Sequence, residues 1–127
     1  MKLIMIMVGG SLGALCRYGI AVTAGKYFGV RFPLGTLVAN GIGCFLIGMA
    51  FALADRTQVL SPNARLFFMT GFLGALTTFS TYALETFQAV RSGSGLTAVL
   101  NFTANNVGGI VLVFAGIWLT QLLLQGR

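Results

Sequence analysis

Four long apolar runs fill almost all of this 127-residue chain and leave only short polar stretches between them. A helix needs about 20 apolar residues to cross the hydrocarbon core of a bilayer. The runs have this length, and they predict membrane-spanning helices at residues 3–27, 34–54, 66–90 and 96–124. Only 8% of the residues are charged, against about a quarter in a typical soluble domain. The sequence therefore predicts one all-α integral membrane domain over residues 1–127.

The first apolar run is expected to stay in the protein as a membrane span. It is longer than the apolar part of a signal peptide, and no small-residue cleavage site ends it before Arg17. The net charge of +6 is scattered over the loops and the termini. Nucleic-acid binding is therefore not expected, because it requires basic residues gathered on one face.

The third run contains residues that a plain lipid-facing helix does not need. Residues 71–85 include two glycines, three aromatic side chains, a terminal acid and four Ser or Thr hydroxyl side chains. The hydroxyl residues are Thr77, Thr78, Ser80 and Thr81. Irregular backbone at membrane depth survives only where it is buried in protein or lines a wet cavity, and such breaks hold ions and substrates in channels and transporters. We therefore expect a helix that is broken near its middle and carries the functional site.

Two aromatic residues follow the expected break. Phe79 and Tyr82 are three residues apart and so share one face of a helix. An aromatic ring has a positive edge, and two edges turned toward a path would stabilise a small anion. Aromatic residues at this spacing more often belong to a packed core, but the neighbouring hydroxyl side chains favour the anion path.

Polar residues within the other spans each allow two interpretations. Asn40, in the second span, offers two N–H donors that suit an anion, or it makes an interhelical hydrogen bond worth about 0.6 kcal/mol. Asn101 and Asn105 share a face of the fourth span, and the same alternatives apply. Arg17 is either a functional intramembrane cation or a side chain that extends to the interface.

The basic residues show no bias toward either side of the membrane. An even number of spans places both termini on one side, together with the loop between the second and third spans. The residues on that side are Lys2, Arg56, Arg65 and Arg127, and those on the other side are Arg17, Lys26, Arg31 and Arg91. Lys and Arg set membrane orientation, so four against four predicts dual topology and pairing of oppositely inserted copies. The alternative is one orientation fixed by other features.

Three motifs carry a resemblance to a known family: GGSLGALCR at residues 9–17, GTLVAN at residues 35–40 and GFLGALTTFSTYALE at residues 71–85. Through these motifs the chain resembles the CrcB/Fluc family of fluoride channels over essentially its whole length. The resemblance implies a passive channel that lets fluoride leave the cytoplasm, and not an enzyme. It further implies an antiparallel homodimer with two pores in the lipid of the bacterial plasma (inner) membrane.

The resemblance also implies roles for individual residues. The implied fluoride pathway consists of Arg17, Thr36, Asn40, Phe79, Ser80, Tyr82 and Asn105. The backbone carbonyls of Gly74 and Thr77 from both subunits are implied to hold a structural sodium ion. Three positions depart from the family pattern: Tyr82 replaces the usual Phe, Gly109 the usual Ser and Val113 the usual Thr. The last two departures remove hydroxyl groups from the polar track of the fourth span.

Two other functions compete with a channel. A small proton-coupled multidrug exporter also has four short spans and dual topology, but it needs a carboxylate deep in the membrane. The first span has no acid, and the two acids of the chain are Asp55 in a predicted loop and Glu85. The third possibility is an assembly protein without transport. The broken helix argues against it, because such a break is costly unless something occupies it.

Overall fold

The computed structural model describes residues 1–126, which form helices joined by short loops. The first two spans are continuous helices, α1 (Lys2–Phe28) and α2 (Leu34–Arg56). The third span, Pro62–Arg91, comprises α3 (Pro62–Arg65), η1 (Leu66–Leu73), α4 (Gly74–Leu76) and α5 (Phe79–Arg91). The fourth, Gly95–Gln125, comprises α6 (Gly95–Thr103), η2 (Ala104–Gly108) and α7 (Gly109–Gln125). The predicted all-α fold with four spans is confirmed.

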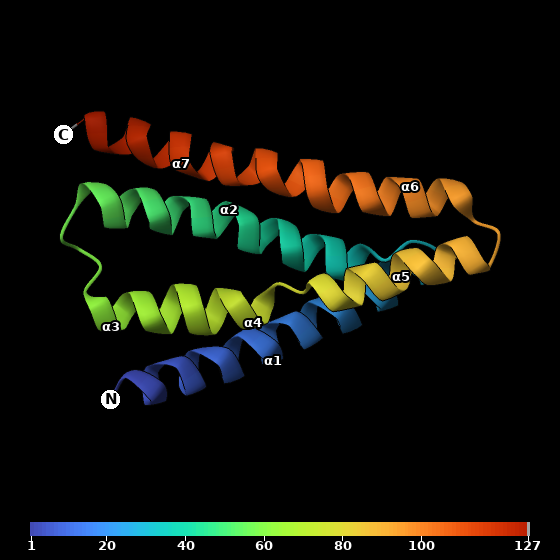
Figure 1. Ribbon diagram of the computed structural model, residues 1–127, viewed down its shortest axis with the longest axis horizontal. Helices are drawn as coiled ribbons and strands as arrows, with labels where there is room; N and C mark the ends of the chain where they lie inside the picture. The colour runs from blue at the N-terminus through green and yellow to red at the C-terminus, as the bar shows by residue number, and fades with distance from the viewer. Residues whose placement is uncertain (127) are drawn as a thin grey trace.

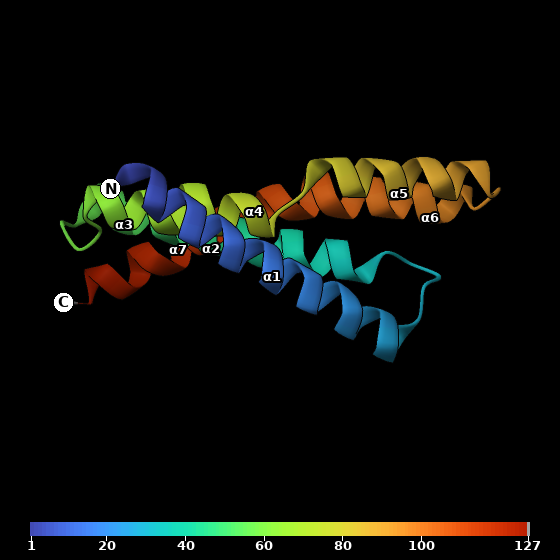
Figure 2. The ribbon, with the colours of Figure 1, turned by 90° about the horizontal axis from the view of Figure 1, so that it is seen from below.

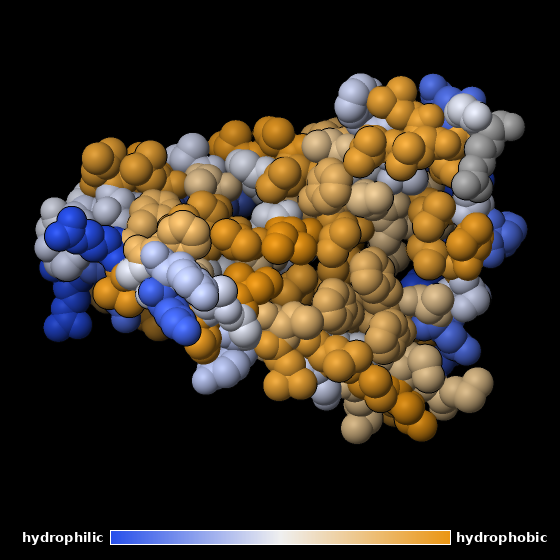
Figure 3. Space-filling model, turned by 180° about the vertical axis from the view of Figure 1, so that it is seen from behind, coloured by the Kyte–Doolittle hydropathy of each residue, from blue (hydrophilic) through white to orange (hydrophobic). Residues whose placement is uncertain are grey.

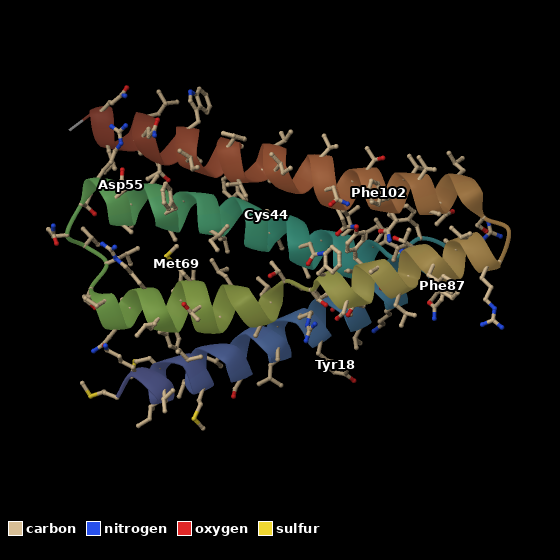
Figure 4. The ribbon with its side chains drawn as sticks, viewed as in Figure 1. Tyr18, Cys44, Asp55, Met69, Phe87 and Phe102 are labelled. Atoms are coloured by element: carbon tan, nitrogen blue, oxygen red, sulfur yellow. The ribbon has the colours of Figure 1, made fainter. Side chains whose placement is uncertain are left out.

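The four spans run alternately up and down along the long axis of the molecule (Figure 1). Both chain ends and the loop between α2 and α3 lie at one end, and the α1–α2 and α5–α6 loops lie at the other. Asp55 lies at the end that holds the termini (Figure 4). Arg127 lies outside the described residues. This arrangement agrees with the side assignment expected from an even number of spans.

Ser61 and Pro62 start the third span. The side chain of Ser61 accepts a hydrogen bond from the backbone N–H of Ala64 at 3.2 Å. Pro62 occupies the first turn, where its missing N–H costs no helical hydrogen bond. The helix therefore has a defined start at the end of the molecule that holds the termini.

Glycines allow the spans to pack at backbone distance. A Cβ at Gly9 would clash with the carbonyl oxygen of Phe67, and a Cβ at Gly13 with that of Phe72. Gly48 of α2 lies in the same way against the backbone of α7. Close approach through small residues is how membrane helices associate, because lipid provides no hydrophobic force between them. The small-residue spacing of the first span thus brings α1 onto η1.

A compact core fixes the position of the third span just before it breaks. Ala39, Leu73 and Leu76 are buried together, with the side chains of α1, α2 and η1 packed around them. Because Leu76 is the last residue of α4, this core anchors the end of the helix that precedes the break.

The α5–α6 hairpin diverges from α1 and from the first part of α2 (Figure 2). Residues of these arms line a cleft of about 450 Å³. Its lining includes Arg31, Thr36, Glu85, Gln88 and Ser94. The end of the molecule that carries the α1–α2 and α5–α6 loops, called the loop end below, is therefore open and polar inside.

The outer surface is apolar over its middle. Figure 3 shows hydrophobic side chains across the centre of one face, with hydrophilic side chains gathered toward its two ends. Large apolar side chains on all four spans are exposed, for example Leu15, Phe51, Phe87 and Phe114. An apolar belt between polar ends is the surface that a membrane-spanning bundle presents to lipid.

Two π-helical segments were not predicted from the sequence. They are η1, which leads into α4, and η2, which contains Asn105 and Asn106. A π-helical turn widens the helix by one residue and is often found at functional sites. Segment η1 ends shortly before the break in the third span. Asn105 and Asn106 of η2 are hydrogen-bonded to Asn40 and Tyr82 beside the break.

Candidate functional site

The third span breaks at Thr77 and Thr78. Helix α4 ends at Leu76 and α5 begins at Phe79. The two residues between them are extended, with φ and ψ of −82° and 153° at Thr77 and −149° and 121° at Thr78. The side chain of Thr78 caps α5 by accepting from the backbone N–H of Thr81 at 3.3 Å. The predicted break near the middle of the span is confirmed.

The break releases several backbone carbonyls from helical hydrogen bonding, among them those of Gly74 and Thr77. In an α-helix the N–H of Thr78 would donate to the carbonyl of Gly74, but it donates instead to Oδ1 of Asn40 at 2.7 Å. Similarly, the N–H of Thr81 donates to the side chain of Thr78 and not to the carbonyl of Thr77. The carbonyls of Gly74 and Thr77 thus lose their usual partners on the two sides of the break.

Asn40 holds the break from the neighbouring span. Besides accepting from Thr78, its Nδ2 donates to the carbonyl of Thr78 at 3.1 Å and to Oδ1 of Asn105 at 2.8 Å. The two N–H bonds of its amide are therefore both directed at protein groups. This geometry corresponds to the interhelical hydrogen bonding considered for Asn40, and it places the amide directly at the broken backbone.

A cavity of about 290 Å³ lies between the break and the fourth span. Six residues of the expected ion pathway and sodium site line it, namely Asn40, Gly74, Thr77, Phe79, Tyr82 and Asn105. Cys44, midway along α2 (Figure 4), also lines it. The fold therefore brings together residues from the second, third and fourth spans that lie far apart in the sequence.

The two aromatic rings meet edge to face at this cavity. Their centroids are 5.1 Å apart and their planes are inclined by 76°. The side chain of Tyr82 is only 6% exposed, whereas Phe79 is 74% exposed. The hydroxyl of Tyr82 accepts from Nδ2 of Asn106 at 2.9 Å, which fixes the orientation of its ring.

Arg17 and Thr36 lie in a second cavity, of about 310 Å³, between α1, α2 and α5. Thr78 and Thr81 also line it, so this cavity reaches the break from the other side. The hydroxyl of Thr36 donates to Oε1 of Glu85 at 2.7 Å. Arg17 is half-buried and lies far from both ends of α1, because each residue of a helix advances about 1.5 Å.

Ser80, a predicted site residue, lies apart from these cavities. Two other asparagines, Asn101 and Asn106, are hydrogen-bonded to α5 beside the site. Ser80 is exposed on the first turn of α5, and it lines neither cavity in the described part of the chain. Asn101 is fully buried, and its Nδ2 donates to the hydroxyl of Thr86 at 2.9 Å. The spacing of Asn101 and Asn105 indicated a shared face, but nothing in the sequence indicated the contact of Asn106 with Tyr82.

Comparison with known proteins gives consistent matches over most of the chain. The family model described as "CrcB-like protein, Camphor Resistance (CrcB)" matches residues 4–117. A protein of Acidobacterium capsulatum named fluoride-specific ion channel FluC is 47% identical over 91% of this chain and 93% of its own length. Proteins with the same name from Salinibacter ruber and Nitrosococcus oceani are 46% and 40% identical, over 99% and 96% of this chain and 94% and 98% of theirs.

Proposed function

Because the chain belongs to the CrcB-like protein family, we propose that it is a fluoride-selective passive channel of a bacterial inner membrane. The observation that carries this proposal is the cavity at the broken third span, where side-chain amides and aromatic ring edges gather around released backbone. Fluoride is small and holds its water strongly. A pore must therefore replace that water with hydrogen-bond donors and positive ring edges.

The cavities provide a route along the third span. The cleft at the loop end and the Arg17 cavity share Ala21, Gly35 and Thr36. The Arg17 cavity and the aromatic cavity share Thr78. We propose that an anion enters between the arms, is attracted by the positive charge of Arg17 and passes the break toward Phe79 and Tyr82.

A fluoride ion on this route would meet the pathway residues one after another. Thr36 would offer a hydroxyl group before the break, and the edges of the Phe79 and Tyr82 rings would receive the dehydrated ion. Asn40 would shape the break through its bonds to Thr78, and Asn105 would extend the polar surface along the fourth span. The route uses passive contacts only, so the proposal includes no catalytic step.

A second, inverted copy of the chain would complete the pore. Phe79 is 74% exposed although it borders the aromatic cavity, so one chain leaves this part of the pathway open. The charge distribution supports inverted insertion: among residues 1–126, and leaving out Arg17, which lies within α1, three basic residues lie at one end and three at the other. An antiparallel homodimer would contain two equivalent pathways, hence two pores.

The released carbonyls fit a structural sodium ion. Unwound backbone at membrane depth commonly coordinates sodium through carbonyl oxygens, and the carbonyls of Gly74 and Thr77 have lost their usual helical donors. Gly74 is exposed, so its backbone is open to a neighbouring copy. We propose that these carbonyls from both copies hold the ion at the dimer centre, where its charge would join the two broken helices.

Fluoride efflux from liposomes tests the proposed function. Purified protein is reconstituted into vesicles loaded with potassium fluoride, and efflux is followed with a fluoride electrode after adding a potassium ionophore. The expected result is rapid release of fluoride, with chloride-loaded vesicles retaining their anion. Release of both anions at similar rates, or of neither, would contradict a fluoride-selective channel.

A further inference from the structure

A continuous chain of hydrogen bonds joins the broken backbone to Tyr82 through three side-chain amides. The N–H of Thr78 donates to Asn40, Asn40 to Asn105, Asn105 to Asn101, Asn101 to the hydroxyl of Thr86, and Thr86 to the carbonyl of Tyr82. The donor–acceptor distances are 2.7, 2.8, 2.9, 2.9 and 2.8 Å in that order. Both ends of the chain lie on the segment that carries the two aromatic rings.

The direction of this hydrogen-bond chain is fixed at its two ends. The N–H of Thr78 can only donate and the carbonyl of Tyr82 can only accept. Every link between them therefore runs the same way, and aligned hydrogen bonds of this kind polarise and strengthen one another. A change at one link is expected to be felt at the others, including at Asn40.

Asn101 occupies the middle of the hydrogen-bond chain and is completely buried, with 0% exposure. It accepts from Asn105 at 2.9 Å, and its Nδ2 also lies 3.4 Å from the carbonyl of Tyr82. Within residues 1–126 it lines neither the aromatic cavity nor the Arg17 cavity. Any effect of Asn101 on an ion must therefore pass through the residues to which it is hydrogen-bonded.

We infer that Asn101 is a positioning residue of the pathway: it fixes the first turn of α5, and with it the Phe79 and Tyr82 rings, against α2 and the fourth span. The turn is held at Thr78 by Asn40 and at Tyr82 by Asn101 and Thr86. This inference rests on the proposed function, because it assigns Asn101 to the same ion pathway.

The substitution pair Thr86→Val and Thr86→Ser tests the inference with little change in packing. Valine removes the hydroxyl that accepts from Asn101, whereas serine retains it. We expect Thr86→Val to lower fluoride flux about fivefold, which corresponds to the loss of one ordinary hydrogen bond. Thr86→Ser should conduct as the wild type does. Thr103→Val on the exposed side of α6 is the matched control. Asn101→Leu, which removes the central amide, should lower flux further.

A spectroscopic measurement reads the same chain without fluoride. The protein has five asparagines, Asn40, Asn63, Asn101, Asn105 and Asn106, and isotope labelling makes their side-chain amides visible by nuclear magnetic resonance. Thr86 has no hydrogen bond to Asn40 in the described residues, yet Thr86→Val should shift the Asn40 amide signals. The Asn40 signals should not move in Thr86→Ser or in Thr103→Val. The Asn63 signals should not move in any variant.

The outcomes separate this inference from the proposed function. The positioning role is overturned if Thr86→Val leaves both the flux and the Asn40 signals unchanged, or if Thr86→Ser is as damaging as Thr86→Val. A wild-type protein that releases no fluoride overturns the proposed function instead. In that case the Asn40 signals alone decide whether Asn101 positions the break.

Discussion

Asn40 and Thr78 exchange two hydrogen bonds across the boundary between the second and third spans. The backbone N–H of Thr78 donates to the side-chain oxygen of Asn40 at 2.7 Å, and the side-chain nitrogen of Asn40 donates back to the carbonyl of Thr78 at 3.1 Å. The amide thus supplies the partners that an extended residue has lost within its own helix. A break at membrane depth requires such partners, because lipid offers none.

Replacing this amide should therefore damage the pathway. Asn40→Leu keeps the apolar packing and removes two bonds to the backbone, each worth about 1 kcal/mol. We expect fluoride flux in liposomes to fall by at least about tenfold while the protein still assembles as a dimer.

Asn63→Leu, at the start of the third span and away from the cavities, is the control for this substitution and should conduct as the wild type does. Size-exclusion chromatography with light scattering measures assembly. If Asn40→Leu dissociates the protein, the amide serves assembly, and the loss of flux does not support a role in the pathway.

Tyr82 should contribute through its ring. The rings of Tyr82 and Phe79 pack edge to face with their centroids 5.1 Å apart, and the Tyr82 hydroxyl accepts a hydrogen bond from Asn106. Tyr82→Phe retains the ring and should keep or raise the flux, whereas Tyr82→Ile should lower it steeply at similar bulk. Both variants are compared in the same efflux assay. A Tyr82→Phe protein that assembles but does not conduct would identify the hydroxyl as an ion ligand.

The fold followed from the sequence because lipid imposes simple rules. Apolar length alone sets the number of spans, and the alternation of spans sets the side of each loop. The break was also predictable, since Gly71, Gly74 and the hydroxyl residues are unnecessary in a lipid-facing helix. Gly9 and Gly13 have the small-residue spacing of closely packed membrane helices, and a Cβ at either position would clash with the backbone of η1.

The polar connections of the site could not be predicted in the same way. Asn40 is 38 positions from Thr78 and 65 from Asn105, so its partners depend on how three spans pack. The π-helical turn at Asn105 and Asn106 shifts the register of the fourth span, and no sequence periodicity revealed it. For this reason the pairing of Asn106 with Tyr82 emerged only from the structure.

Inside-out and outside-out copies should occur in comparable numbers. Cys16 and Cys44 are first replaced by alanine, and Gln58→Cys then places one thiol in the exposed loop between α2 and α3. A membrane-impermeant thiol reagent added to intact cells should label about half of the copies, because the basic residues show no bias. Labelling of nearly all copies, or of almost none, would reject dual topology.

Sodium should stabilise the assembled protein if the carbonyls of Gly74 and Thr77 bind it. A ligand bound only to the native state adds about 2.7 kcal/mol when present at about 100 times its dissociation constant. We therefore expect a higher unfolding temperature and slower dimer dissociation in sodium chloride than in the chloride of a large organic cation. Equal stability in the two salts, at matched ionic strength, would argue against the ion.

Gly109 and Cys44 should behave as a coupled pair. Gly109 is buried, and a Cβ built on it would lie 3.2 Å from Sγ of Cys44. This distance is shorter than an ordinary Cβ contact, so a larger residue at position 109 requires the thiol to shift.

The expected result is that Gly109→Ser alone destabilises the protein by roughly 1 kcal/mol or more through overpacking. Cys44→Ala removes the crowding. In that background, adding Gly109→Ser should therefore cost little or no further stability. The added hydroxyl would lie beside position 44, which lines the aromatic cavity, so the double variant should conduct fluoride at least as fast as the wild type. Thermal unfolding and liposome efflux measure the two effects. Equal stability losses for Gly109→Ser with and without Cys44 would show that the thiol does not determine the residue at position 109.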